Sequence, residues 1–159
     1  MVQRIRAGAW VIFAFIVTTL AASPLVGQGQ SKERLIVSGD LAWFLGPGKP
    51  LNCTLNNRYK RGDPVGFRVT AINGTTGERD RAAKLVVHVN YLGKTIDLPM
   101  RDHEDARTPD RKFWVAKWIV PNDAPPGIVR FAVTAQDPDG RTGEWKPFEV
   151  DASQLTIIE

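Results

Sequence analysis

The feature that most constrains the fold of this chain is a repeated alternation of apolar and polar residues within short segments. Residues 65–71 read Val-Gly-Phe-Arg-Val-Thr-Ala, so the side chain at every second position is apolar. Residues 85–91 and 129–135 also carry apolar side chains at every second position. Since successive side chains of a β-strand point to opposite faces of a sheet, this period predicts strands. After residue 28, no segment of ten or more residues has the apolar period of a helix.

Turn-forming residues separate the predicted strands at short intervals. Clusters rich in Gly, Pro, Asn and Asp occupy residues 61–64, 73–77, 121–127 and 137–140. Leu92 and Gly93 predict a tight hairpin between strands at 84–91 and 95–98. Pro147 falls inside a predicted strand at 144–150, which indicates an edge strand or a bulge. About seven or eight short strands in regular succession predict an all-β fold, either a two-sheet antiparallel sandwich or a small barrel.

The apolar faces of these strands define the expected core. We expect six residues to meet between the two sheets: Phe67, Val69, Trp114, Trp118, Phe131 and Val133. A strand slipped by one residue would instead bury Arg68, Lys117 and Arg130. Because burying an unpaired cation costs several kcal/mol, the expected register keeps the six apolar residues inside.

Residues 1–28 have the layout of a secretory signal peptide. Arg4 and Arg6 precede an uncharged apolar run over 10–22, and small or polar residues follow it. That run holds about a dozen residues, whereas a membrane-spanning helix needs about 20. We expect cleavage between Ser23 and Gln30, one domain over residues 32–159, and a secreted or periplasmic location. An uncleaved N-terminal anchor, which would place the chain at a membrane, is the alternative.

The charge balance argues against nucleic acid as a partner. The chain has 21 Lys and Arg against 17 Asp and Glu, and loss of Arg4 and Arg6 with the leader leaves 19 against 17. Basic and acidic residues are mixed along the chain, whereas a nucleic-acid-binding protein carries a clustered basic face. We therefore expect the partner to be another exported or membrane-bound protein.

Cys53 is the only cysteine, so the stability of the domain must come from its core and not from an internal disulfide. A free cysteine most often behaves as a small buried apolar residue, and we expect Cys53 to be buried. An intermolecular disulfide and a metal thiolate are the alternatives for this residue.

The residue types that catalysis needs are scarce in this sequence. His88 and His103 are the only histidines, and neither lies near a Gly-x-Ser-x-Gly motif, which does not occur. The sequence also lacks a phosphate-cradling glycine loop and a His-Glu-x-x-His motif. His88 falls on the polar face of a predicted strand, which indicates a solvent or inter-strand role. We therefore predict that the protein is not an enzyme and uses no cofactor.

Two further groups of residues are candidates for binding. Met100 and His103 lie with several carboxylates in a predicted polar loop over residues 99–111, and such a set suits a divalent metal. Two arginines in this loop favour the alternative of a solvated loop. Trp43, beside a Gly/Pro-rich loop, and Trp145, on a possible edge strand, are candidate ligand-binding residues, since aromatic rings stack on sugars or anchor protein partners.

The tripeptide Arg61-Gly62-Asp63 has the sequence of an adhesion motif. The same three residues, followed by Pro64, are also suited to the turn before the strand at 65–71. We favour the turn as the role of this tripeptide.

Two segments carry a resemblance to a known family. The residues Gly62-Asp63-Pro64-Val65 resemble the approach to the second strand of bacterial immunoglobulin-like domains. Residues 126–137, followed by Gly140, are similar to the penultimate strand and final hairpin of these domains. The resemblance covers residues 56–150, extends to fibronectin type III-like domains, and implies an exported immunoglobulin-like β-sandwich without implying any functional residue.

Together these features predict an exported, non-catalytic binding or accessory module that acts through protein–protein contacts. A periplasmic metal-binding protein that uses the Met100–His103 loop is the first alternative. A glycan-binding module is the second alternative, and it requires Trp43 or Trp145 to lie on an open face or in a cleft.

Overall fold

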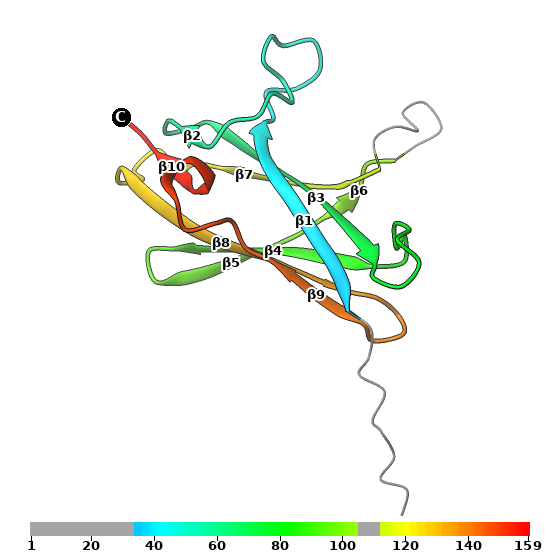
Figure 1. Ribbon diagram of the computed structural model, residues 1–159. Coiled ribbons are helices and arrows are strands. Elements are labelled where there is room, and N and C mark those ends of the chain that lie inside the picture. Colours follow the sequence, from blue (N-terminus) through cyan, green and yellow to red (C-terminus); the bar gives the residue numbers. More distant parts are fainter. Residues whose placement is uncertain (1–33, 105–111) are drawn as a thin grey trace, which may run out of the picture. The chain divides into compact units, whose positions relative to one another are not determined.

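The computed structural model describes residues 34–104 and 112–159. The predicted signal peptide lies outside the described residues. The strands are β1 (Leu35–Trp43), β2 (Arg58–Tyr59), β3 (Pro64–Asn73), β4 (Lys84–Tyr91), β5 (Lys94–Pro99), β6 (Arg101–Asp102), β7 (Trp114–Ile119), β8 (Gly127–Gln136), β9 (Thr142–Trp145) and β10 (Leu155–Ile157). A single 3-10 turn, η1 (Asp151–Ser153), precedes β10 in this part of the chain (Figure 1).

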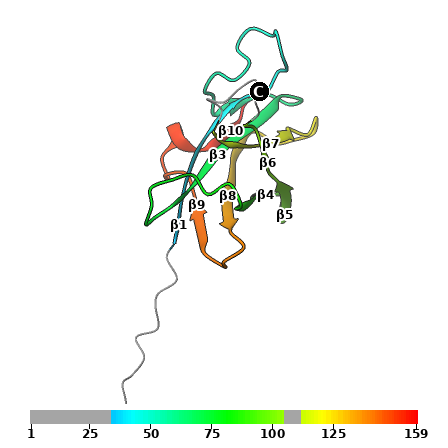
Figure 2. The ribbon, with the colours of Figure 1, turned by 90° about the vertical axis from the view of Figure 1, so that its right-hand side faces the viewer.

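The strands form two sheets, and the predicted all-β fold is confirmed. The first sheet has the order β1-β3-β7-β6, and the second has the order β2-β10-β8-β4-β5, with β9 also paired to β8. Figure 1 shows β1 passing in front of β4, and Figure 2 shows the same strands after a quarter turn. Seven strands have four or more residues (β1, β3, β4, β5, β7, β8 and β9), in agreement with the expected number.

Neighbouring strands in both sheets pair antiparallel, with one exception. Strand β5 extends the second sheet beside β4, and β10 forms a short parallel pair with β2 in an otherwise antiparallel structure.

The core lies between the sheets, as the apolar period predicted. All six expected core residues are buried: Phe67, Val69, Trp114, Trp118, Phe131 and Val133. The rings of Phe67 on β3 and Phe131 on β8 meet edge to face with their centroids 5.1 Å apart, so the contact joins the two sheets. The tail strand β10 adds the buried side chains of Leu155 and Ile157.

Arg68 lies on the outer face of the first sheet, opposite the core residues of β3. Its Nε and Nη2 atoms donate to the two carboxylate oxygens of Asp40 on β1, at 2.7 and 2.8 Å. The guanidinium also lies over the ring of Phe113 at 5.8 Å and donates to the carbonyl of Cys53 at 3.1 Å. The hydrogen bonds to Asp40 raise the pKa of Arg68. This arginine therefore fastens neighbouring segments and is not a freely solvated side chain.

Three local expectations were wrong. Residues 101 and 102 form the short strand β6 within the segment that was expected to be a loop. The expected strand over 144–150 stops at Trp145, because Pro147 has no backbone N–H to donate to a ladder. Cys53 is exposed and not buried. It lies in a tight turn at a φ of 66°, where its N–H donates to the carbonyl of Trp43 at 2.7 Å.

The hairpin between β8 and β9 is fixed by an ion pair. The buried carboxylate of Asp137 accepts a hydrogen bond from the backbone N–H of Arg141 at 2.8 Å and another from its guanidinium. The guanidinium of Arg141 also contacts Asp80, 3.3 Å away, and Asp139, 3.1 Å away. Burial by itself raises the pKa of the Asp137 carboxyl, but the hydrogen bonds from Arg141 outweigh it and hold the pKa below its ordinary value.

We expect the Trp118→Ala substitution to lower the free energy of unfolding by about 3–5 kcal/mol, because it empties a large volume in the core. The matched control is Lys117→Ala on the same strand, where the side chain is exposed, and its effect should stay within about 0.5 kcal/mol. Urea unfolding of the two variants measures the difference. Equal unfolding midpoints for both variants would contradict this assignment of the core.

The Asp137–Arg141 pair predicts acid sensitivity. A carboxyl whose pKa is lower in the folded than in the unfolded state stabilises the fold fully above its unfolded pKa, which is about 3.9. That contribution is lost as the pH falls from about 4 towards the lower folded pKa. We expect Asp137→Asn to be less stable than the parent at neutral pH and to lose less stability than the parent below pH 4. Unfolding midpoints measured from pH 7 to pH 2.5 test this, and parallel curves for the two proteins would refute it.

Candidate functional site

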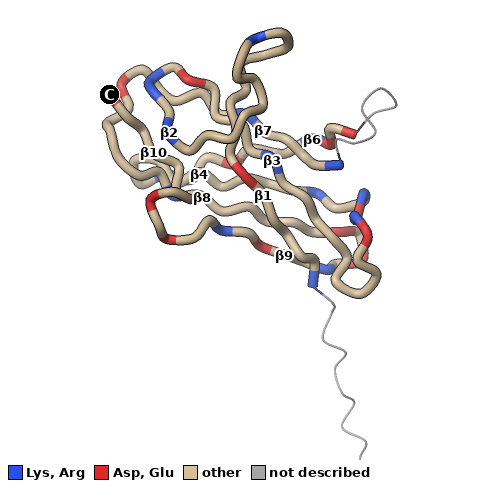
Figure 3. Tube along the Cα trace, turned by 45° about the horizontal axis from the view of Figure 1, so that its top comes forward, with Lys and Arg blue, Asp and Glu red and all other residues tan. Residues whose placement is uncertain are grey.

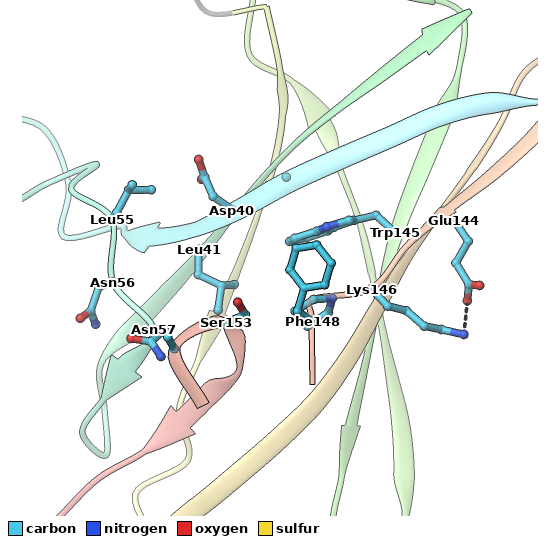
Figure 4. Close-up of a pocket in the computed structure, with 13 residues that line it drawn as sticks. Asp40, Leu41, Leu55, Asn56, Asn57, Glu144, Trp145, Lys146, Phe148 and Ser153 are labelled. Carbon is cyan, nitrogen blue, oxygen red and sulfur yellow. Dashed lines mark ion pairs between the residues drawn. The ribbon is translucent and has the colours of Figure 1, made fainter. Parts of the chain in front are cut away.

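A hollow of about 670 Å³ opens beside β1 and β9 (Figure 4). Four segments form its walls: the middle of β1, residues 55–57 ahead of β2, the end of β9 with the residues after it, and η1. Its lining includes Gly39, Asp40, Leu55, Trp145, Phe148 and Ser153. The hollow brings together parts of the chain that lie about a hundred residues apart in the sequence, which is why the sequence did not reveal it.

The hollow exists because the strand edge beside β8 is interrupted between β9 and β10. Strand β9 pairs with residues 133–136 of β8, and β10 pairs with residues 127–129 of the same strand. The chain between β9 and β10 leaves the sheet after Trp145 and turns through η1. The buried side chain of Gln154 donates a hydrogen bond to the carbonyl of Phe148 at 2.5 Å. Asn57 donates to the carbonyls of Asp151 and Gln154 at 2.9 and 3.1 Å, so the part of this segment next to β10 is fixed.

Trp145 belongs both to the core and to the hollow. Its ring meets Phe131 edge to face with a centroid separation of 5.5 Å, and the residue is half-buried. A Cβ atom built on Gly39 would lie 3.1 Å from the Trp145 ring, so the indole packs directly on the backbone of β1. Trp145 was chosen from the sequence as a candidate ligand-binding residue. The structure places it in the wall of the hollow.

Phe148 is a site residue that the sequence analysis missed. Its side chain is 81% exposed, although it is a large apolar ring at the mouth of the hollow. Figure 4 shows Trp145 and Phe148 on the same stretch of chain at the end of β9. The available signal was the neighbouring Pro147, which ends the strand and leaves the next aromatic residue outside the sheet.

The charged groups around the hollow are already paired. Both carboxylate oxygens of Asp40 accept hydrogen bonds from Arg68, as described above. The ammonium of Lys146 lies 2.9 Å from the carboxylate of Glu144, and both side chains are largely exposed. Figure 3 shows basic and acidic residues interspersed over the described strands. The hollow therefore presents aromatic and amide groups to solvent, and its charged side chains are paired with opposite charges of the same protein.

Trp43, the second candidate ligand-binding residue, is not part of this hollow. Its ring meets Tyr59 edge to face at 5.0 Å, and the residue is half-buried. The Tyr59 hydroxyl, whose pKa is raised by burial, donates to the carbonyls of Ala42 and Asn56 at 3.0 and 2.8 Å, sharing its one proton. Trp43 thus packs against a buried, hydrogen-bonded tyrosine.

The proposed metal ligands lie in a segment whose carboxylates are engaged by arginine. Arg79 lies 2.6 Å from both Asp102 and Glu104, and its guanidinium stacks 3.9 Å above the ring of Trp114. Burial by itself raises the pKa of Asp102. The hydrogen bonds from Arg79 and from the backbone of Glu104, with the positive charges of Arg79 and Arg81, outweigh burial and hold the pKa below its ordinary value. Met100 packs against the core. Across residues 34–104 and 112–159, no three His, Cys, Asp or Glu side chains gather into a possible metal site.

His103 is held by contacts of its backbone and its imidazole ring with Phe113. Its N–H donates to the carbonyl of Phe113 at 3.0 Å, and its imidazole lies at a tilt beside the Phe113 ring, with centroids 5.5 Å apart. Residues 105–111 of the expected polar loop lie outside the described residues.

His88 joins three neighbouring strands on the outer face of the second sheet. Its Nδ1 lies 2.7 Å from a carboxylate oxygen of Asp97 on β5, and its Nε2 lies 2.8 Å from the hydroxyl of Thr134 on β8. The order hydroxyl–imidazole–carboxylate is that of a nucleophilic triad, but these are cross-strand neighbours on an open sheet face. Of the solvent or inter-strand role expected for His88, the structure shows the inter-strand one.

The Arg61-Gly62-Asp63 tripeptide is held in its turn by hydrogen bonds. Arg61 donates from Nε to the carbonyl of Ala124 at 2.7 Å, and the N–H of Gly62 donates to the carbonyl of Val120 at 2.9 Å. The carboxylate of Asp63 accepts from the N–H of Lys60 at 2.5 Å. The structural role expected for this tripeptide is confirmed.

No protein-family model matches the sequence. A search of curated proteins also finds no match to this chain. Within the described residues, no helix has the length and apolar character needed to cross a membrane. The case for function therefore comes from the fold and from the geometry of the hollow.

The two aromatic residues of the hollow should differ in their effect on stability. Trp145→Ala removes a ring packed on Phe131 and Gly39, and we expect it to lower the free energy of unfolding by about 1–3 kcal/mol. Phe148→Ala removes an exposed ring, and its effect should stay within about 0.5 kcal/mol. Chemical denaturation of both variants measures this, and a loss at Phe148 as large as that at Trp145 would show that Phe148 has a packing role.

Proposed function

We propose that this chain is an exported, non-catalytic binding module of the immunoglobulin-like or fibronectin type III-like kind, located in the periplasm or secreted. It acts through protein–protein contacts, and its partner is another exported or membrane-bound protein. The observation that carries this proposal is the hollow beside β1 and β9, with the exposed ring of Phe148 at its mouth.

The exposure pattern around the hollow supports a protein partner. Phe148 is 81% exposed, and Leu55 on the opposite wall is 68% exposed. Apolar side chains of this size are costly to leave in water, and aromatic residues are enriched at the centres of protein interfaces. Recognition in β-sandwiches is commonly carried by loops and edges, and this hollow lies at such an edge.

The hydrogen bonds and ion pairs of the polar side chains also favour a binding role over a catalytic one. Both ring nitrogens of His88 are used in cross-strand hydrogen bonds, and the carboxylates of Asp102 and Glu104 are used in ion pairs with Arg79. Each of these contacts holds two segments of the fold together.

Glycan binding is the second candidate function, and one observation favours it. Trp145 lines an open hollow together with the amide of Asn56 and the hydroxyl of Ser153. The apolar face of a sugar ring stacks on an indole, while its hydroxyls take hydrogen bonds from amides and hydroxyls.

Site-directed photo-crosslinking in the exporting cell tests the proposed function. A photoreactive phenylalanine analogue replaces Phe148 in one variant and Leu92 in the control, where a large apolar side chain is 68% exposed at a distant hairpin. We expect a discrete crosslinked protein from position 148 in the exported fraction and none from position 92. Recovery of the position-148 variant only as uncrosslinked chain, or of the protein only from the cytoplasm, would contradict the proposal.

A further inference from the structure

Part of the edge of β1 directs its backbone groups into the hollow. Strand β1 is the outermost strand of the first sheet. On the side away from β3, the carbonyl of Leu41 accepts from the N–H of Asn56 at 3.1 Å, and Trp43 bonds to residues 53 and 54 at 2.7 and 2.9 Å. In an antiparallel ladder the N–H and C=O of every second residue point to the same side. Gly39, two positions before Leu41, therefore directs its N–H and C=O away from β3 as well.

This part of the edge has no strand beside it. Among the described residues, β1 forms a ladder with β3 alone, and its outer side makes one isolated bridge, from Ala42 to Leu55. Leu35, Val37 and Leu41 share a face with Gly39 and are buried, yet Gly39 is exposed because the hollow opens over it. An unpaired, exposed strand edge is a template for pairing with another chain.

The free stretch of the edge is short and bounded at both ends. At one end Gly143 of β9 packs so closely on the backbone of Leu35 that a side chain there would collide with it. At the other end residues 53–56 occupy the edge from Leu41 onwards. Three or four residues of an extended segment, roughly 10–14 Å in length, fit between these limits.

Apolar surface stands on both sides of this free edge. The indole of Trp145 lies against Gly39, and Phe148 and Leu55 expose their side chains at the mouth of the hollow. An added strand would place alternate side chains towards these surfaces while its backbone pairs with the edge. The charges of Asp40 and Glu144 are satisfied by Arg68 and Lys146, so the hollow presents no free charge for an ionic group to meet.

We propose that the hollow binds an extended, uncharged and apolar segment of the partner protein, which adds a short strand to β1 at Gly39 and packs against Trp145 and Phe148. This inference rests on the proposed protein-binding function and specifies how that binding occurs. Backbone hydrogen bonds at Gly39 supply affinity that is independent of sequence, and the contacts with Trp145 and Phe148 supply selectivity.

The test uses the folded domain and a library of random linear peptides of twelve residues. Peptides selected on the parent protein are synthesised in two forms, one unmodified and one N-methylated at alternate residues, which removes backbone donors but keeps the side chains. We expect the unmodified form to protect the Gly39 amide from hydrogen exchange, and N-methylation in one of the two registers to weaken binding by about tenfold or more. Phe148→Ala should weaken binding of the unmodified form, whereas the control Leu92→Ala should leave it unchanged.

Three results would overturn the inference. One is equal affinity of the unmodified and N-methylated peptides in both registers. Another is binding without protection of the Gly39 amide. The third is failure of the library to give any peptide whose binding depends on Phe148. Saturable binding of cellotetraose, maltotetraose or chitotetraose at Trp145, together with that failure, would favour glycan binding instead. A protein crosslinked at position 148 in the cell, combined with any of these results, would leave the proposed function standing and refute strand addition alone.

Discussion

Edge-to-face contacts between three aromatic rings connect the core of the sandwich to its candidate site. Phe67 on the first sheet meets Phe131 on the second at 5.1 Å, and Phe131 meets Trp145 at 5.5 Å. Each contact depends on the register of the strand that carries the ring, because a shift by one residue would turn the ring to the other face. The same packing that joins the two sheets therefore also fixes the indole in the wall of the hollow.

This arrangement separates the rigid part of the site from the adaptable part. Trp145 is held by the core and by the backbone of Gly39, so its position is set before anything binds. Phe148 is exposed and follows the end of the strand, so its ring has rotational freedom that binding would remove. A site of this kind combines a preorganised platform with a side chain that adjusts to the occupant, and on this protein's side the entropy cost of binding falls mainly on one residue.

Much of the fold could be predicted from the sequence because a strand with one buried face carries its own period. The alternation in residues 65–71 and 129–135 identified the inward residues of β3 and β8. The site was less accessible, because it depends on segments that meet only in three dimensions. Trp145 was identified from its place on a possible edge strand, whereas Phe148 was missed because Pro147 was interpreted as an edge or bulge residue within a strand over 144–150 and not as the end of that strand. Cys53 is exposed in a turn where its φ is positive, and local composition did not reveal this turn.

The close approach of β1 to its neighbours β3 and β9 limits how this protein can vary in evolution. A Cβ atom at Gly39 would collide with the carbonyl of Arg68, and one at Gly143 would collide with the backbone of Leu35. Real Cβ atoms do not approach backbone so closely, so a larger residue at Gly39 must push β1 away from β3, and one at Gly143 must push β9 away from β1. The neighbouring Ser38 and Glu144 are exposed and tolerate exchange on these grounds. Descendants of this chain that keep the hollow should therefore diverge freely around these two glycines while the glycines themselves persist, which makes the pair a marker for the site in sequences that share little else.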